Sequence, residues 1–104
     1  MIRATEWRPR LSGTLQGFTT LTLSPSGLVL NDCTLHRHED GREWIGLPGK
    51  PQTDKEGRQR RDPATGRVLY QPIVEIKGKE QRERFQTAAL AAVHALLGDG
   101  QVVA

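Results

Sequence analysis

Short apolar runs separated by turn residues fill the first half of the chain, a pattern typical of antiparallel hairpins. Residues favoured in turns, Ser24 to Gly27 and His38 to Gly41, divide these runs. The connection at Ser24 to Gly27 has a length that is common in β-hairpins. The pattern predicts four strands in a meander, at Ile2 to Arg8, Leu15 to Leu23, Leu28 to His36 and Arg42 to Leu47.

The last part of the chain has the periodicity of an amphipathic helix. Lys79 to Leu97 contains no glycine or proline, and Gly98 follows where a helix often ends. The apolar residues recur at spacings of three and four, and they predict a core-facing stripe of Phe85, Ala88, Ala89, Ala92, Val93 and Leu96. The first turns are charged, and a solvated, mutually paired face is expected for Glu80, Arg82, Glu83 and Arg84.

One more β-prone stretch, Arg67 to Lys77, precedes this helix, and Pro72 marks it as an edge strand or a bulged strand. The elements together predict an α+β fold, an antiparallel sheet of about five strands with one C-terminal helix packed on it. Residues 1–104 are expected to form a single domain, because this length suits one core. One alanine-rich helix cannot cover a five-stranded sheet, so the uncovered apolar surface or an edge beside Pro72 is expected to pair in a homodimer.

The segment from Pro48 to Gly66 interrupts the β pattern. It has three prolines, three glycines and no large apolar residue, so it is predicted to be a flexible basic arm, residues 48–66, without regular structure. The chain has 15 Lys and Arg against 12 Asp and Glu, a net charge of +3. All of this surplus lies between Gly49 and Arg67, where three acids accompany Lys50, Lys55, Arg58, Arg60, Arg61 and Arg67.

A concentrated cationic segment attracts anions, and the planar arginine side chain suits phosphate oxygens. The six cations are therefore the candidate nucleic-acid-binding residues, with DNA or RNA as partner. The charge run also has a simpler interpretation as a solvated loop. The alternative function is a protein-interaction or assembly module that pairs through its sheet and binds no nucleic acid.

The four sheet aromatics, Trp7, Phe18, Trp44 and Tyr70, allow two interpretations. An aromatic ring on an open sheet can stack with an unpaired base. An aromatic residue in a strand more often packs in the core or against a cross-strand neighbour. Core or cross-strand packing is the expectation for all four.

No catalytic chemistry is indicated. Cys33 is the only cysteine, so neither an internal disulfide nor a multi-cysteine zinc site can form within the chain. His36 and His38 near Cys33 suggest zinc, but a regular strand places Cys33 opposite His36, so a solvated strand end is favoured. Phosphate-loop, dinucleotide, zincin and hydrolase motifs are absent from the sequence. We therefore expect no enzyme activity, no cofactor and no metal.

Composition places the chain among folded, non-membrane proteins. Apolar residues make up 36% and charged residues 26% of the chain, a balance that supports a modest core. No run of 18 apolar residues occurs, and no apolar stretch follows the arginines of the first ten residues. Neither a membrane span nor a signal peptide is expected, and a cytoplasmic location is predicted.

Four features of the chain occur together in one known family. They are the arginine-rich first strand, the stretch Trp44-Ile45-Gly46-Leu47-Pro48-Gly49-Lys50, the proline-containing strand at Gln71-Pro72-Ile73, and the closing helix. In these features and in the order of its elements, the chain resembles the SpoVG family of small bacterial proteins. The resemblance implies a small α+β protein that dimerises through strands and regulates by binding DNA or RNA. It also implies a contact with nucleic acid for Lys50 and Arg67.

Overall fold

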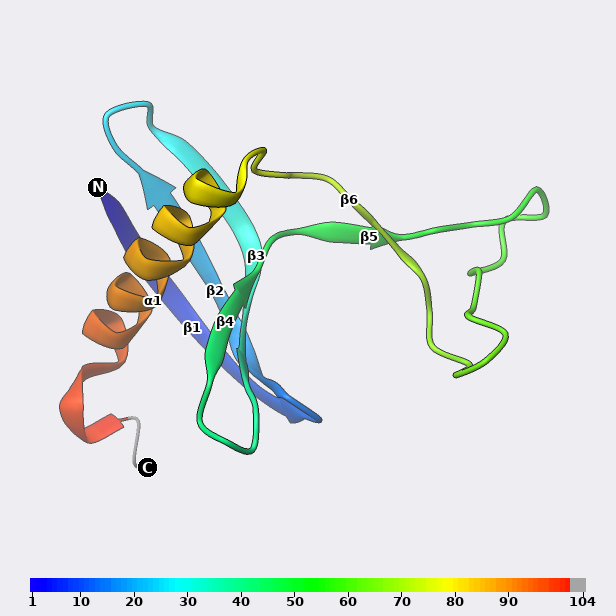
Figure 1. Ribbon diagram of the computed structural model, residues 1–104, viewed down its shortest axis with the longest axis horizontal. Coiled ribbons are helices and arrows are strands. Elements are labelled where there is room, and N and C mark those ends of the chain that lie inside the picture. Colours follow the sequence, from blue (N-terminus) through cyan, green and yellow to red (C-terminus); the bar gives the residue numbers. More distant parts are fainter. Residues whose placement is uncertain (102–104) are drawn as a thin grey trace.

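The computed structural model describes the backbone of residues 1–101 and the side chains of residues 1–98. Its main sheet has four antiparallel strands in the order β1-β2-β3-β4, and the helix α1 (Lys79–Gln101) packs on one face of it (Figure 1). The strands are β1 (Ile2–Ser12), β2 (Leu15–Leu23), β3 (Leu28–Arg37) and β4 (Glu43–Gly46). A second sheet pairs β5 (Gly49–Pro51) with β6 (Tyr70–Pro72). The predicted α+β fold is confirmed.

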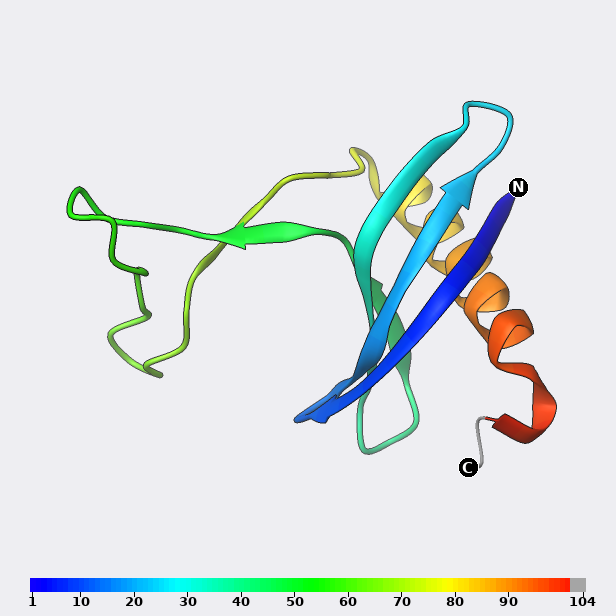
Figure 2. The same cartoon turned by 180° about the vertical axis from the view of Figure 1, so that it is seen from behind.

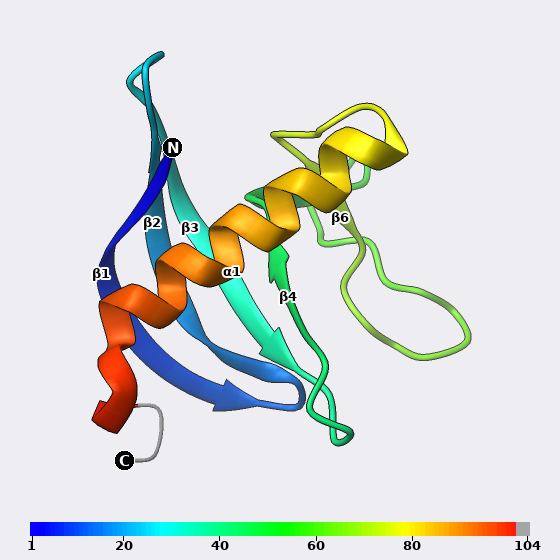
Figure 3. The same cartoon turned by 60° about the vertical axis from the view of Figure 1, so that its left-hand side comes forward.

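The core lies between α1 and the sheet, and the helix crosses the sheet obliquely from β4 towards β1 (Figure 3). Leu21, Leu35 and Ile45 of the sheet are almost completely buried against it. The helix contributes every fourth residue, namely Phe85, Ala89, Val93 and Leu97. The predicted stripe is therefore wrong at two positions: Ala88 is exposed, and Leu97 is buried in place of Leu96, which remains 37% exposed.

The regular helix ends where the sequence predicts. Gly98 has φ 72° and ψ 169°, outside the helical region, and the chain bends there before a short helical continuation to Gln101. Glycine adopts positive φ without the steric cost that a Cβ would add. A single glycine therefore fixes the length of the helix that covers the sheet.

Two bulges change which side chains face the helix. Glu6 (φ 56°) and Asp32 (φ 59°) adopt the left-handed backbone conformation, and the register of the adjoining strand pairs shifts beside each. An extra residue in one strand reverses the alternation of faces beyond it. Trp7 follows the first bulge and Cys33 follows the second. Both residues are register partners of Thr19 on β2, and all three face the helix.

The predicted strand from Arg67 to Lys77 is wrong in extent and in position. Only Tyr70–Pro72 forms a strand, and it pairs with β5 instead of joining the main sheet. Beyond it, Val74 and Ile76 alternate with exposed residues and pack against the core. Residues 73–77 keep the period-2 pattern, but they form an extended connection and not a strand. Pro72 pairs with Gly49 on one side only, so the edge expected beside it belongs to the small second sheet and not to the main sheet.

The outer edge of β4 is covered by a side chain of the helix. The amide nitrogen of Ile45 donates a hydrogen bond to Gln86 Oε1, and Gln86 Nε2 donates to the Ile45 carbonyl oxygen, both at 2.8 Å. The carboxamide thus takes the place of a neighbouring strand. A covered edge is one way in which sheets avoid unwanted pairing.

The sequence suggested that the basic arm has no regular structure, and this expectation is wrong. It lies within the β5–β6 hairpin (residues 49–72), which continues outwards through isolated bridges between Thr53 and Gln59 and between Arg61 and Val68. Backbone hydrogen bonds also join Gln52 to Leu69 across the hairpin. The hairpin projects from the side of the sheet opposite to α1 (Figures 1 and 2). Among the described residues, no helix is long and apolar enough to cross a membrane.

Candidate nucleic-acid interface

The sheet has an open face, turned away from α1, which no helix covers (Figure 2). Strand register assigns its residues, since partners on adjacent strands share a face. Two rows run across the strands, one formed by Arg8, Phe18 and Thr34 and one formed by His36 and Trp44. A third row, near the other end of the sheet, contains Arg3, Thr22 and Val29. The open face is polar, with aromatic rings among its residues and two arginines, of which Arg8 is ion-paired with Asp32 at 2.6 Å.

The open face carries a stacked pair of rings. His36 and Trp44 are cross-strand partners with ring centroids 5.2 Å apart and planes inclined by 5°. Two hydroxyls hold the imidazole: Thr14 Oγ1 lies 2.9 Å from Nδ1 and Thr34 Oγ1 lies 3.0 Å from Nε2. Burial lowers the pKa of His36, which favours its neutral form. Trp44 itself is 38% exposed.

The expected core or cross-strand packing is found for Trp7, which packs against the core, and for Phe18 and Trp44, which pack against cross-strand partners. It is not found for Tyr70. Trp7 packs against the core on the helix side, over Gly17. Phe18 is half-buried on the open face, where the Arg8 guanidinium lies 5.5 Å from its ring centroid. Trp44 stacks across strands outside the core, and Tyr70 on the hairpin is 62% exposed.

The six predicted site cations all lie on the β5–β6 hairpin, but their side chains have different roles. Arg58 lies 3.5 Å from Asp54 Oδ2 and 3.7 Å from Glu56 Oε2. Arg60 donates to Gln52 Oε1 at 3.2 Å, and Arg61 donates to the Gly66 carbonyl oxygen at 3.0 Å. These three arginines brace the hairpin. Within the described part of the chain, the side chains of Lys50, Lys55 and Arg67 make no hydrogen bond or ion pair, although the backbone nitrogen of Arg67 donates to Thr65 Oγ1 at 3.3 Å.

The two aspartates of the basic arm form its turns. Asp54 Oδ1 accepts hydrogen bonds from the backbone nitrogens of Glu56 and Arg58, both at 2.9 Å. Asp62 Oδ1 accepts from the Ala64 nitrogen at 2.7 Å in the same way. Such Asp turns followed by glycine are readable in a sequence. They are the signal that would have predicted an ordered hairpin instead of a structureless arm.

Cys33 lies in the core and not in a reactive site. Its thiol is fully buried and donates to the Leu30 carbonyl oxygen, with the sulfur 3.6 Å from that oxygen. Burial, and secondarily the Asp32 carboxylate, raises the pKa of Cys33 to about 11, so thiolate is scarce at neutral pH. Cys33 faces the helix and His36 faces away, as predicted, and no group of three metal-ligating side chains gathers in the described residues.

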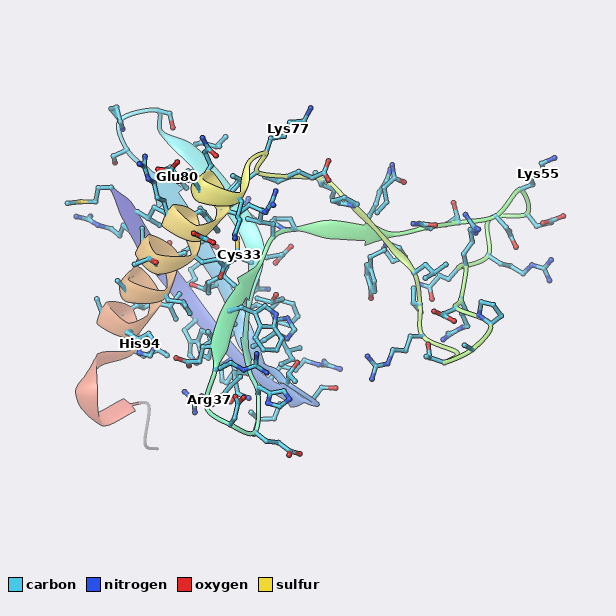
Figure 4. All side chains as sticks on the ribbon, in the orientation of Figure 1. Cys33, Arg37, Lys55, Lys77, Glu80 and His94 are labelled. Atoms are coloured by element: carbon cyan, nitrogen blue, oxygen red, sulfur yellow. The ribbon has the colours of Figure 1, made fainter. Side chains whose placement is uncertain are left out.

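Two features of the site escaped the sequence reasoning. One is the His36–Trp44 stack, whose members lie on either side of the predicted turn at His38 to Gly41 and become partners once that hairpin has a register. The other is a set of polar contacts that joins the helix to the β3–β4 hairpin. Glu43 accepts from Arg37 Nη2 at 2.9 Å and lies 2.8 Å from His94 Nε2 (Figure 4). These contacts fix the strands that carry the stack.

The chain was also compared with known proteins. It matches no protein-family model, no curated protein and no solved structure.

Proposed function

We propose that the protein binds nucleic acid, with the cations of the β5–β6 hairpin contacting phosphates. One observation carries the proposal: the hairpin that contains the whole charge surplus extends from the same side of the sheet as the open face (Figures 1 and 4). A ligand that reaches the hairpin is thereby brought to a polar face with exposed aromatic groups.

The division of roles among the cations supports this proposal. Arg58, Arg60 and Arg61 stiffen the hairpin through their own contacts. Lys50, Lys55 and Arg67 keep their donors for a ligand, and Lys55 lies near the outer tip (Figure 4). Phosphate contact requires only well-placed cations and no catalytic group. The resemblance to the SpoVG family supports the same function, as well as Lys50 and Arg67 as contacts.

A triple variant of Lys50, Lys55 and Arg67 to Gln tests the proposal. Affinity for an oligonucleotide should fall at every sequence tested. The slope of log K against log salt should flatten by about 2 to 3, because each phosphate contact contributes about 0.7 to 0.9. The matched control is Lys77, Lys79 and Arg84 to Gln, which removes the same charge around the start of α1, where Lys77 lies (Figure 4). Electrophoretic mobility shifts or fluorescence anisotropy over a salt series would measure both.

Equal losses in the two triple variants would show that only total charge matters, and the hairpin would lose its assigned role. Unchanged affinity in the first variant would refute the proposal.

The assembly alternative is favoured by β1, which has a strand partner on one side only. If the protein elutes from heparin at low salt and light scattering gives the mass of a dimer, pairing along β1 is the better explanation.

A further inference from the structure

The open face displays one tryptophan although a buried position would suit this residue better. Trp44 is 38% exposed, while the second tryptophan, Trp7, packs against the core. Nothing in the hydrogen-bond network requires an indole at position 44, because the described contacts show no bond from its nitrogen. The exposed ring is therefore free to contact a ligand.

The surroundings of Trp44 hold a flat ring pair in place. His36 supports the indole with almost parallel planes, and Thr14 and Thr34 hydroxyls fix both of its ring nitrogens. Gly46 lies beside this group, and a Cβ there would collide with the Thr34 hydroxyl. Two hydroxyls and one missing side chain thus fix the orientation of the imidazole. Burial keeps that imidazole neutral, as an aromatic support should be.

The stack lies close to the cations of the proposed interface. Lys50 follows Trp44 by six residues, and six residues span at most about 20 Å when fully extended. A nucleic-acid strand whose phosphates contact Lys50 can therefore place a nearby base at Trp44. Every base has a π-face that stacks on an aromatic ring, whereas a base inside a duplex already has both faces covered.

We propose that the Trp44–His36 pair is a stacking platform for an unpaired base, which makes single-stranded nucleic acid the ligand. This inference rests on the proposed function and adds the strand class to it. A protein partner would also use an exposed indole, but the neighbouring hairpin has a net positive charge and favours a polyanion. Duplex can contact the cations but offers no base to the platform.

The test measures binding of three labelled probes: oligo(dT), oligo(rU) and a duplex of the same length. A length of about 12 nucleotides lies within the range of one small single-strand-binding module. Trp44→Ala should weaken single-strand binding by about 5- to 150-fold, the range for loss of one stacked base. Its salt slope should stay unchanged, because no charge is lost. Trp44→Phe should keep affinity within about threefold, since phenylalanine can also stack.

Val29→Ala is the matched control, because Val29 is an apolar residue of the open face in the row near the other end of the sheet, 48% exposed. It should bind like the wild type.

If Trp44→Ala fails to fold, as circular dichroism would show, the Trp7→Phe variant replaces it. In that protein Trp44 is the only tryptophan, and oligo(dT) should quench its emission when tryptophan is excited selectively over Tyr70. Comparison of oligo(dT) with oligo(rU) separates DNA from RNA.

Three results would overturn the inference. Full single-strand affinity in Trp44→Ala, or no quenching of Trp44, would exclude stacking. Equal affinity of the wild type for duplex would exclude the strand preference while leaving the hairpin proposal intact. Loss of a dimer in Trp44→Ala with unchanged nucleic-acid binding would assign the indole to a protein interface. Failure of the wild type to bind any oligonucleotide would instead refute the proposed function itself.

Discussion

Replacing Gln86 by alanine should open the outer edge of β4. The wild-type carboxamide makes two hydrogen bonds of 2.8 Å, one with the nitrogen and one with the oxygen of Ile45. A neutral hydrogen bond contributes a net 0.5 to 1.5 kcal/mol, so the loss should be about 1 to 3 kcal/mol. The better helix propensity of alanine returns only a few tenths of a kcal/mol. The free energy of unfolding should therefore fall by about 1 to 2.5 kcal/mol.

Urea unfolding followed by circular dichroism gives the change directly, and the melting temperature should fall by about 4 to 8 °C for each kcal/mol. Gln81→Ala is the control, because it is the same substitution at an exposed position of the same helix. Gln86→Glu gives a second check. Its carboxylate can accept from the Ile45 nitrogen but cannot donate to the Ile45 oxygen. A protonated carboxyl group can do both, so lowering the pH towards the ordinary carboxyl pKa near 4.3 should restore stability.

Equal stability of Gln86→Ala and Gln81→Ala would show that the two bonds are replaced by water at no cost. In that case the carboxamide would not be protecting the edge. A second readout follows from the same geometry. If Ile45 is left with free polar groups at an edge, Gln86→Ala should associate at high concentration more than Gln81→Ala does. Light scattering over a concentration series would detect the difference.

Two further predictions concern the sheet. Gly17→Ala should destabilise the fold by about 1 to 3 kcal/mol and shift Trp7 fluorescence, because its Cβ would lie 2.7 Å from the Trp7 ring and 2.8 Å from the Arg8 carbonyl oxygen. Normal stability and emission would show that Trp7 moves aside freely. Burial lowers the pKa of His36 in the folded state, so the unfolded chain takes up this proton first. Stability should therefore fall as pH drops below about 6.5 and level off once folded His36 is protonated. His36→Gln should lose this part of the pH dependence in urea titrations, and an unchanged profile would assign it to other groups.

Local patterns predicted the elements well where a few neighbouring residues decide the conformation. Gly98 ends the regular helix, and the hairpin connections lie where turn residues gather. β1 extends to Ser12 instead of ending at Arg8, because pairing with β2 continues as far as Leu15. That pairing is a contact between strands, which a single run of residues does not reveal.

The faces of the strands were harder to predict for a physical reason. Bulges occur at Glu6 and Asp32, two ordinary residues with positive φ, so no glycine marks them in the sequence. Each bulge inverts the side-chain alternation that follows. The six cations were found from composition alone, whereas the exposure of Trp44 depends on register and on what the helix fails to cover.

The base of the β5–β6 hairpin makes it a separable insertion. Gly49 pairs with Pro72, and the Ile73 nitrogen donates to the Pro48 carbonyl oxygen, so the chain leaves and re-enters the body at one point. Doubling the length of a loop with fixed ends costs only about 0.6 kcal/mol. Relatives of this chain can therefore lengthen, shorten or exchange the hairpin while the sheet and helix stay as they are, and the reach of the protein can evolve independently of its core.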